Sequence, residues 1–245
     1  MSGVNETLAA YRLPELNRGS IDAVVFDMDG VLLDSERLDR RLWQSVAIRR
    51  GFSFPDHVHA ALVGRREEEC LTLLGAHFGA QVDITSLYRE LEAVWQDEVL
   101  RSGIPLKAGV HRMLNLLDAH HIPKAIATST RRSKALQSLG PLAVRFDVIA
   151  CGDEVPQGKP APDVYLRAAA ILDVAPRRCL ALEDSIHGLQ SASSAGMIVV
   201  MIPDLLDAPP DAPYVCGSLD GVAAEMESAL ACDPNCNSLI DRSAR

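Results

Sequence analysis

The stretch that decides the fold is residues 21–35, which read IDAVVFDMDGVLLDS. A short β-branched and aromatic run ends there at two aspartates and Gly30, which predicts a buried strand with carboxylates at its carboxyl end. Asp27 and Asp29 are one residue apart, so on an extended chain both carboxylates point to the same side. Such a pair suits a nucleophile beside a general acid or base, or a cation site. Taken alone, it is equally typical of a turn or helix cap.

Four further short apolar runs follow along the chain, at residues 123–128, 146–151, 179–182 and 198–202. Apolar residues at helical spacing precede the first and third of these runs. Strands that alternate with helices predict an α/β fold in which a parallel sheet carries helices on both faces.

Residues 35–104 interrupt this alternation, because their apolar side chains recur at helical spacing without a convincing strand. We expect an inserted all-α domain here, in a core made of residues 21–34 and 105–245. Residues 1–20 then form an N-terminal extension. The two connections to the insertion are expected to run side by side and to allow a hinge motion.

Charge and hydropathy exclude some classes of function. The 245 residues include 24 Lys and Arg against 33 Asp and Glu, a formal net charge of −9, which is the wrong sign for binding a nucleic-acid backbone. No apolar run approaches the roughly 20 residues of a membrane helix, and no secretory signal pattern is visible. We therefore expect a cytoplasmic protein that binds neither nucleic acid nor membrane, and we expect a monomer by default.

Residues 27–35, DMDGVLLDS, resemble the first motif of the haloacid dehalogenase-like (HAD) hydrolases. The similarity is greatest to the branch with β-phosphoglucomutase and the sugar-phosphate phosphatases, which insert a small helical cap just after this motif. The other family motifs follow in order at Thr128, at Lys159 in GKPAPD, and at Glu183-Asp184-Ser185. The resemblance covers about residues 21–203 and implies a Rossmann-like parallel core.

The resemblance also implies a role for each matching residue. Asp27 is the expected nucleophile, which forms an aspartyl-phosphate, and Asp29 is the expected general acid and base. Thr128 is expected to donate a hydrogen bond to a phosphoryl oxygen, and Lys159 to supply a fixed positive charge. Each also has an ordinary alternative, since strand-end threonines and exposed lysines are common.

The cofactor implied by the resemblance is Mg²⁺, a hard cation that prefers oxygen ligands. Its expected ligands are the carboxylate of Asp27, the backbone carbonyl of Asp29, and Asp184, with Glu183 as a further candidate. Ser185 is expected instead to cap the helix that follows it.

Substrate specificity is expected to come from the cap and from the loop after Thr128. Arg65 in the cap loop is expected to face the substrate, and Ser129, Thr130 and Arg131 are expected to help bind it. Both arginines fit an exposed surface charge equally well. Arg66, which precedes three glutamates, is interpreted as a helix-surface charge.

The leading interpretation is an Mg²⁺-dependent phosphomonoester hydrolase acting on a small sugar or polyol phosphate. The alternative is a β-phosphoglucomutase-type phosphosugar mutase. Trp43 fits the pattern of β-phosphoglucomutase, but Asp39 occupies the position at which that enzyme has a cap histidine. A catalytically inactive binding protein on the same fold is less favoured, because every catalytic position of the family is occupied.

Overall fold

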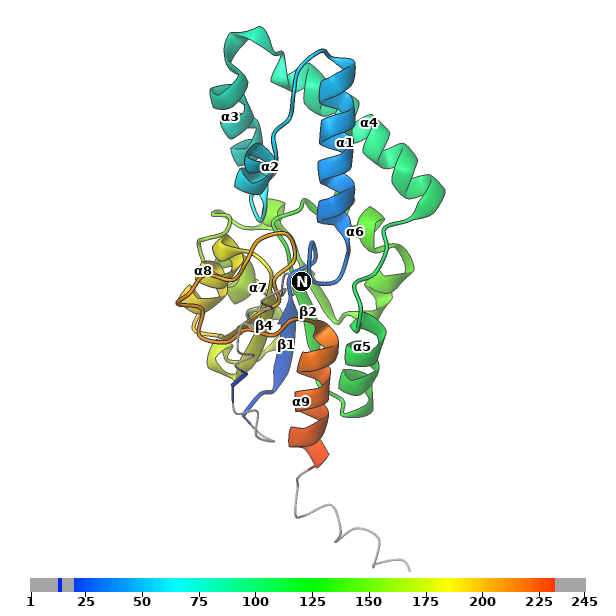
Figure 1. Ribbon diagram of the computed structural model, residues 1–245. Helices are drawn as coiled ribbons and strands as arrows, with labels where there is room; N and C mark the ends of the chain where they lie inside the picture. The colour runs from blue at the N-terminus through cyan, green and yellow to red at the C-terminus, as the bar shows by residue number, and fades with distance from the viewer. Residues whose placement is uncertain (1–12, 15–19, 232–245) are drawn as a thin grey trace, which may run out of the picture.

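The structure, a computed structural model, describes residues 13–14 and 20–231 (Figure 1). Most of the expected N-terminal extension and the last part of the expected core, residues 232–245, therefore lie outside the described residues.

Five parallel strands form the central sheet in the order β3-β2-β1-β4-β5. All five apolar runs of the sequence form strands, and the expected α/β class with a parallel sheet is confirmed. The strands are β1 (Ala23–Phe26), β2 (Lys124–Ala127), β3 (Val148–Ala150), β4 (Cys179–Glu183) and β5 (Ile198–Met201).

Helices cover both faces of the sheet, because alternate side chains of β1 point in opposite directions and all four are buried. Val24 and Phe26 belong to an apolar cluster with α5 (Val110–Ala119), α6 (Arg132–Leu139) and α9 (Leu219–Ala231). Ala23 and Val25 belong to the opposite cluster, with α7 (Asp163–Leu172) and α8 (Ile186–Ser194). Short 3₁₀ helices occur at Gly79–Gln81, Gly140–Arg145, Gly152–Glu154 and Pro176–Arg178.

Four helices follow β1 and stand over the sheet's carboxyl edge (Figure 1). They share an apolar cluster of their own, in which the rings of Trp43 and Phe54 stack with their centroids 4.9 Å apart. We call them the cap helices: α1 (Ser35–Arg49), α2 (Asp56–Leu62), α3 (Glu67–Phe78) and α4 (Ile84–Ser102). The helical spacing in the sequence predicted α1, α3 and α4, whereas α2 is too short to give a clear periodic signal.

The two connections between the sheet and the cap helices lie side by side, as expected. The backbone N–H of Asp34 donates to the carbonyl of Pro105 at 2.8 Å, and that of Lys107 donates to Leu32 at 2.9 Å. The buried carboxylate of Asp204, in the loop after β5, accepts from Lys107 Nζ and from Arg37 Nη1, each at 2.6 Å. Both connections are thereby tied to the same loop.

The order of the strands in the sheet indicates where a ligand would bind. β2 and β3 lie on one side of β1, and β4 and β5 on the other, so the order changes direction beside β1. In open parallel sheets, ligands bind at the carboxyl ends of the strands at such a switch point. Residues that follow β1, β2 and β4 therefore converge there, beneath the cap helices. Within residues 13–14 and 20–231, no helix is both long and apolar enough to span a membrane.

Candidate active site

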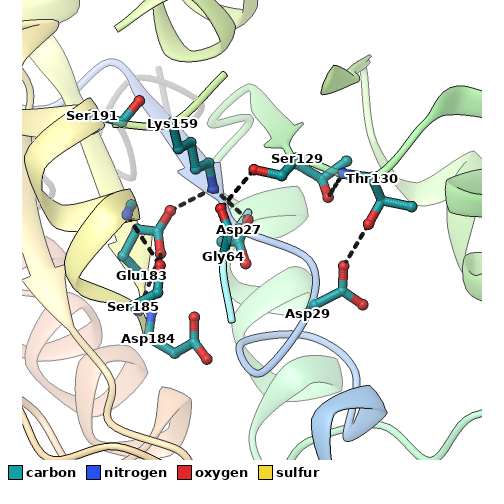
Figure 2. A network of polar contacts seen from close by, with 12 residues as sticks. Asp27, Asp29, Gly64, Ser129, Thr130, Lys159, Glu183, Asp184, Ser185 and Ser191 are labelled. Carbon is teal, nitrogen blue, oxygen red and sulfur yellow. Dashed lines mark hydrogen bonds and ion pairs between the residues drawn. The ribbon is translucent and has the colours of Figure 1, made fainter. Parts of the chain in front are cut away.

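A buried lysine lies between two carboxylates at the carboxyl ends of β1 and β4 (Figure 2). Lys159 Nζ donates to Asp27 Oδ1 and to Glu183 Oε1, each at 2.5 Å. The Tyr165 hydroxyl donates to the same Glu183 oxygen at 2.6 Å. The Lys159 side chain is only 1% exposed, so it is not a solvated surface charge.

The carboxylates in this group crowd one another. Burial raises the pKa of Asp27 to about 8; the charge of Lys159 opposes this rise, and Glu183 and Asp29 add to it. Burial and the neighbouring Asp27 and Glu183 also raise the pKa of Asp184 well above its usual range. Burial acts to lower the pKa of Lys159, but Asp27 and Glu183 outweigh it and raise that pKa above its usual value. One lysine therefore does not balance three buried acids, and the cluster favours a further cation.

The donor set fits a hard divalent ion. Oxygens of Asp27, Glu183 and Asp184 lie within 4.8 Å of one another. Glu183 already accepts from Lys159, Tyr165 and Ser185. No group in the described part of the chain donates to the Asp184 carboxylate. Asp27 and Asp184 therefore offer the freest oxygens, which are the ligand type that Mg²⁺ prefers.

Two glycines leave room for these carboxylates. Gly30 has a φ of +82°, and a Cβ built there would lie 2.0 Å from Asp184 Oδ2. A Cβ at Gly188 in α8 would lie 1.8 Å from the Glu183 carboxyl carbon. The close approach of both acids therefore depends on the absence of a side chain at these two positions.

We expect Gly30→Ala to reduce the phosphatase activity predicted from the sequence by about 100-fold, because Asp184 must move away from the new methyl group. Gly51→Ala is the matched control: Gly51 has the same φ of +82°, with nothing within 4 Å of a built Cβ. Both variants lose about 1–2 kcal/mol of unfolding free energy from the left-handed backbone conformation. Urea unfolding and a phosphate-release assay check this. Equal turnover in the two variants would contradict the role given to the Asp184 position.

Asp29 lies on the cavity side of the cluster and is held by two hydroxyl groups. Ser35 Oγ donates to one carboxylate oxygen at 2.6 Å, and Thr130 Oγ1 donates to the other at 2.9 Å. Asp27 and Asp29 line the same cavity, as the sequence predicted, although β1 already ends at Phe26. Thr128 follows β2 and is buried, and its Oγ1 accepts from the Thr130 backbone N–H at 3.0 Å. Its own hydroxyl hydrogen can still be donated to a ligand.

The loop between α2 and α3 reaches the sheet edge. Ser129 Oγ donates to the Gly64 carbonyl at 2.9 Å, which joins the loop after β2 to the cap (Figure 2). A Cβ at Gly64 would lie 2.7 Å from Ser185 Oγ. Ser185 caps α8, as expected, because its hydroxyl accepts from the Gly188 N–H at 3.0 Å.

The two arginines of this loop have different surroundings. Arg65 lines the cavity, but its Nη1 pairs with Glu69 at 3.3 Å and its Nε donates to the Ala61 carbonyl. The interpretation of Arg66 as a helix-surface charge is wrong, because its Nη2 donates to the carbonyl of Val155 at 2.9 Å. Arg66 lies just before α3, and its side chain contacts the loop after β3. The spacing of charges along the sequence cannot reveal a contact with so distant a loop.

Arg131 also lines the cavity and is half-exposed. Its Nη2 pairs with Glu92 Oε2 of α4 at 2.8 Å, and Lys134 Nζ pairs with the other Glu92 oxygen at 2.6 Å. The first turn of α6 is thereby linked to the cap.

Several residues at the site carry no signal that the sequence analysis used. Glu92 is far along the chain from every motif, whereas Tyr165 and Lys134 come shortly after GKPAPD and Arg131 without belonging to a motif. Glu36 lies just past the first motif, and His59 is one of two histidines on the short helix α2. Their proximity follows from packing, so only a spatial contact could have identified them.

Comparisons with known proteins agree with this geometry. The family model of the haloacid dehalogenase-like hydrolases matches residues 21–196. The relative named (DL)-glycerol-3-phosphatase 1, mitochondrial, from Arabidopsis thaliana is 35% identical over 211 residues, or 80% of this chain and 68% of the relative. The β-phosphoglucomutase of Bacillus subtilis is 30% identical over 184 residues, which are 73% of this chain and 81% of the relative. The crystal structure of CbbY from Rhodobacter sphaeroides in complex with phosphate has a TM-score of 0.73 and 27% identity, covering 84% of this chain and 99% of that one.

The parallel sheet, the buried lysine with its carboxylates, and the helices above them define a Rossmann-like enzyme with an inserted group of helices. The chain belongs to the haloacid dehalogenase-like hydrolase family, and the resemblance found in the sequence is confirmed.

Proposed function

We propose that the protein is an Mg²⁺-dependent phosphomonoesterase that hydrolyses a small sugar or polyol phosphate through an aspartyl-phosphate on Asp27. The observation that carries this proposal is the position of Asp27. It lies at the end of the central strand, hydrogen-bonded to the buried Lys159, at the wall of a cavity of about 490 Å³ beneath the cap helices. That volume is in the range of small-molecule sites, about 300–1,000 Å³.

A carboxylate oxygen of Asp27 attacks phosphorus and displaces the leaving oxygen of the substrate, so the phosphoryl group is transferred to Asp27. Lys159 holds the nucleophile in place and supplies positive charge, and the Thr128 hydroxyl donates to a phosphoryl oxygen. Asp27 and Asp184, with Glu183 and the Asp29 carbonyl, would hold Mg²⁺, which neutralises charge on the phosphoryl group.

Asp29 performs the proton transfers. Its carboxyl group protonates the leaving oxygen, and the resulting carboxylate then removes a proton from the attacking water. The hydrogen bonds from Ser35 and Thr130 fix the orientation of this group for both steps. The protonated and the ionised form of Asp29 are both needed in one catalytic cycle. We therefore expect the Asp29→Asn variant to release no phosphate in a steady-state assay.

The cap helices supply the substrate side of the site. We propose that residues 35–104 act as a cap domain on a core of residues 21–34 and 105–245, and that the cap excludes water during phosphoryl transfer. Arg65, Ser129, Thr130 and Arg131 are our candidates for substrate binding. A cytoplasmic location and a monomeric state stay predictions from the sequence.

A phosphosugar mutase is the second candidate, and one contact favours it. The cap histidine expected of a mutase is Asp39 here, but His59 Nε2 of α2 lies 3.5 Å from Asp39 Oδ2. The cap therefore does bring a histidine close to this position.

We expect hydrolysis to exceed isomerisation. The measurement supplies β-glucose 1-phosphate with a trace of glucose 1,6-bisphosphate and follows glucose 6-phosphate and inorganic phosphate together. Simple phosphate esters are assayed in parallel. Because Asp29 can activate water as soon as the phosphoenzyme forms, phosphate release should be the faster process. Formation of glucose 6-phosphate much faster than phosphate release from any ester would replace the hydrolase with the mutase.

A further inference from the structure

Lys159 lies in a loop that is held from both sides of the active site. After Lys159, the Ala161 carbonyl accepts from Ser191 Oγ of α8 at 2.6 Å. Lys159 itself donates to Asp27 and to Glu183, at the ends of β1 and β4. The part of the loop that follows the lysine is thereby bound to the core.

The part of the loop before Lys159 is bound to the cap. Arg66, just before α3, donates through Nη2 to the Val155 carbonyl at 2.9 Å and through Nη1 to the Pro156 carbonyl at 3.4 Å. Arg66 also lines the cavity. One cap side chain therefore holds the backbone that leads into the buried lysine.

Gly158, directly before Lys159, leaves room for this arginine. A Cβ built at Gly158 would lie 2.5 Å from Arg66 Nε and 2.7 Å from Arg66 Cδ. In this position Arg66 Nε is buried and has no hydrogen-bond partner among the described residues. A buried donor without a partner costs free energy, so the carbonyl bonds and the packing over Gly158 have to offset that cost.

Building on the phosphatase function proposed above, we infer that Arg66 is a positioning residue that couples the cap to the catalytic lysine. Its bonds to the loop set the place of Lys159, which in turn holds the nucleophile Asp27. Arg66 acts on the reaction through this loop and not through contact with the substrate. Lys159 is therefore fully in place only when the cap lies on the core.

A small displacement of the loop is enough for this coupling to matter. Lys159 Nζ lies 2.5 Å from an oxygen of Asp27 and 2.5 Å from one of Glu183, so a shift of the lysine lengthens both bonds. Rates fall steeply when a catalytic group is misplaced by about 1 Å. Loss of Arg66 should therefore lower kcat and leave KM nearly unchanged.

The first test is the kinetics of Arg66→Ala in full-chain protein with Mg²⁺, on glycerol 3-phosphate and on p-nitrophenyl phosphate. We expect kcat to fall by about tenfold or more and KM to change by less than about twofold. Arg41→Ala is the matched control, because Arg41 is a cap arginine that is 66% exposed and pairs with Glu98. It should change neither constant. A raised KM with unchanged kcat would make Arg66 a substrate-binding residue and overturn the inference.

Gly158→Ala tests the same contact from the core side. Gly158 has no positive φ, so alanine brings no backbone strain, but its methyl group takes the space of Arg66 Nε. We expect kcat to fall about as far as in Arg66→Ala, and the double variant to be no slower than either single variant. Gly75→Ala is the control, because nothing lies within 4 Å of its built Cβ. Losses that multiply in the double variant would overturn the shared contact. Circular dichroism and thermal unfolding establish that every variant is folded.

Hydrogen exchange separates this inference from the proposed chemistry, because it needs no turnover. Two backbone N–H groups on either side of Lys159 are hydrogen-bonded: that of Gln157 to Asp163 Oδ1 at 3.2 Å, and that of Ala161 to the carbonyl of residue 158 at 2.9 Å. We expect Arg66→Ala to speed their exchange by at least about threefold, and the two control variants to leave it unchanged.

Faster exchange in Arg66→Ala supports the anchoring of the lysine loop even if the wild type hydrolyses no ester. In that case the phosphatase proposal alone fails. Exchange that is unchanged in Arg66→Ala and in Gly158→Ala would overturn the inference, whatever the enzyme turns over.

Discussion

Asp27→Asn should abolish phosphate release, with turnover lowered by about 10⁴-fold or more, while the protein stays folded. The amide has nearly the shape of the carboxylate but is a far poorer nucleophile, so no phosphoenzyme can form. The substitution also removes one acid from a crowded buried cluster, so stability should not fall with activity. Rapid acid quench measures the amount of phosphoenzyme, and a steady-state phosphate assay measures turnover.

The control for this experiment is Asp207→Asn, which alters an exposed aspartate in the loop after β5. It should leave turnover and melting temperature unchanged. A folded Asp27→Asn protein that retains most of the wild-type activity would falsify the aspartyl-phosphate mechanism.

Removing divalent metal should stop the reaction completely, and Mg²⁺ should restore it. Asp27, Glu183 and Asp184 are buried within 4.8 Å of one another, and Lys159 alone does not balance their charge. Ion binding relieves this repulsion in the folded state only, so Mg²⁺ should also raise the melting temperature. The assays are turnover after treatment with a chelator and thermal unfolding with and without added Mg²⁺.

Asp184→Asn provides the matched variant for the metal prediction. It removes the carboxylate that accepts no hydrogen bond from the described residues, so it should weaken Mg²⁺ binding and reduce the Mg²⁺-dependent rise in melting temperature. Full activity in chelator, with metal content measured as zero, would contradict the proposed site.

The strands and the acidic motif could be predicted because they depend on neighbours in the sequence. The run before Asp27 is apolar and β-branched, and β1 forms there with all four residues buried. Ser185 precedes apolar residues at helical spacing, and it caps α8. Periodicity and capping act over a few residues, so they are visible in the sequence.

Arg66 shows where such local reasoning fails. Its neighbours Glu67, Glu68 and Glu69 indicated a helix-surface charge, yet its guanidinium reaches carbonyls 89 and 90 positions away. The contact of His59 with Asp39 likewise joins two helices whose relative position depends on the packing of the cap. Neither contact has a signal in the residues that surround it along the chain.

The sequence by itself determined the α/β class, the five strands, the helical insertion and the acid pair at the end of the first strand, because hydrophobic period and side-chain chemistry are local properties. Only the tertiary structure decided the strand order, the placement of Lys159 between Asp27 and Glu183, and the contact of His59 with Asp39. Lys159 and Asp27 are 132 positions apart. Contacts over such separations form only when strands pair and helices pack, and that outcome depends on the whole chain at once.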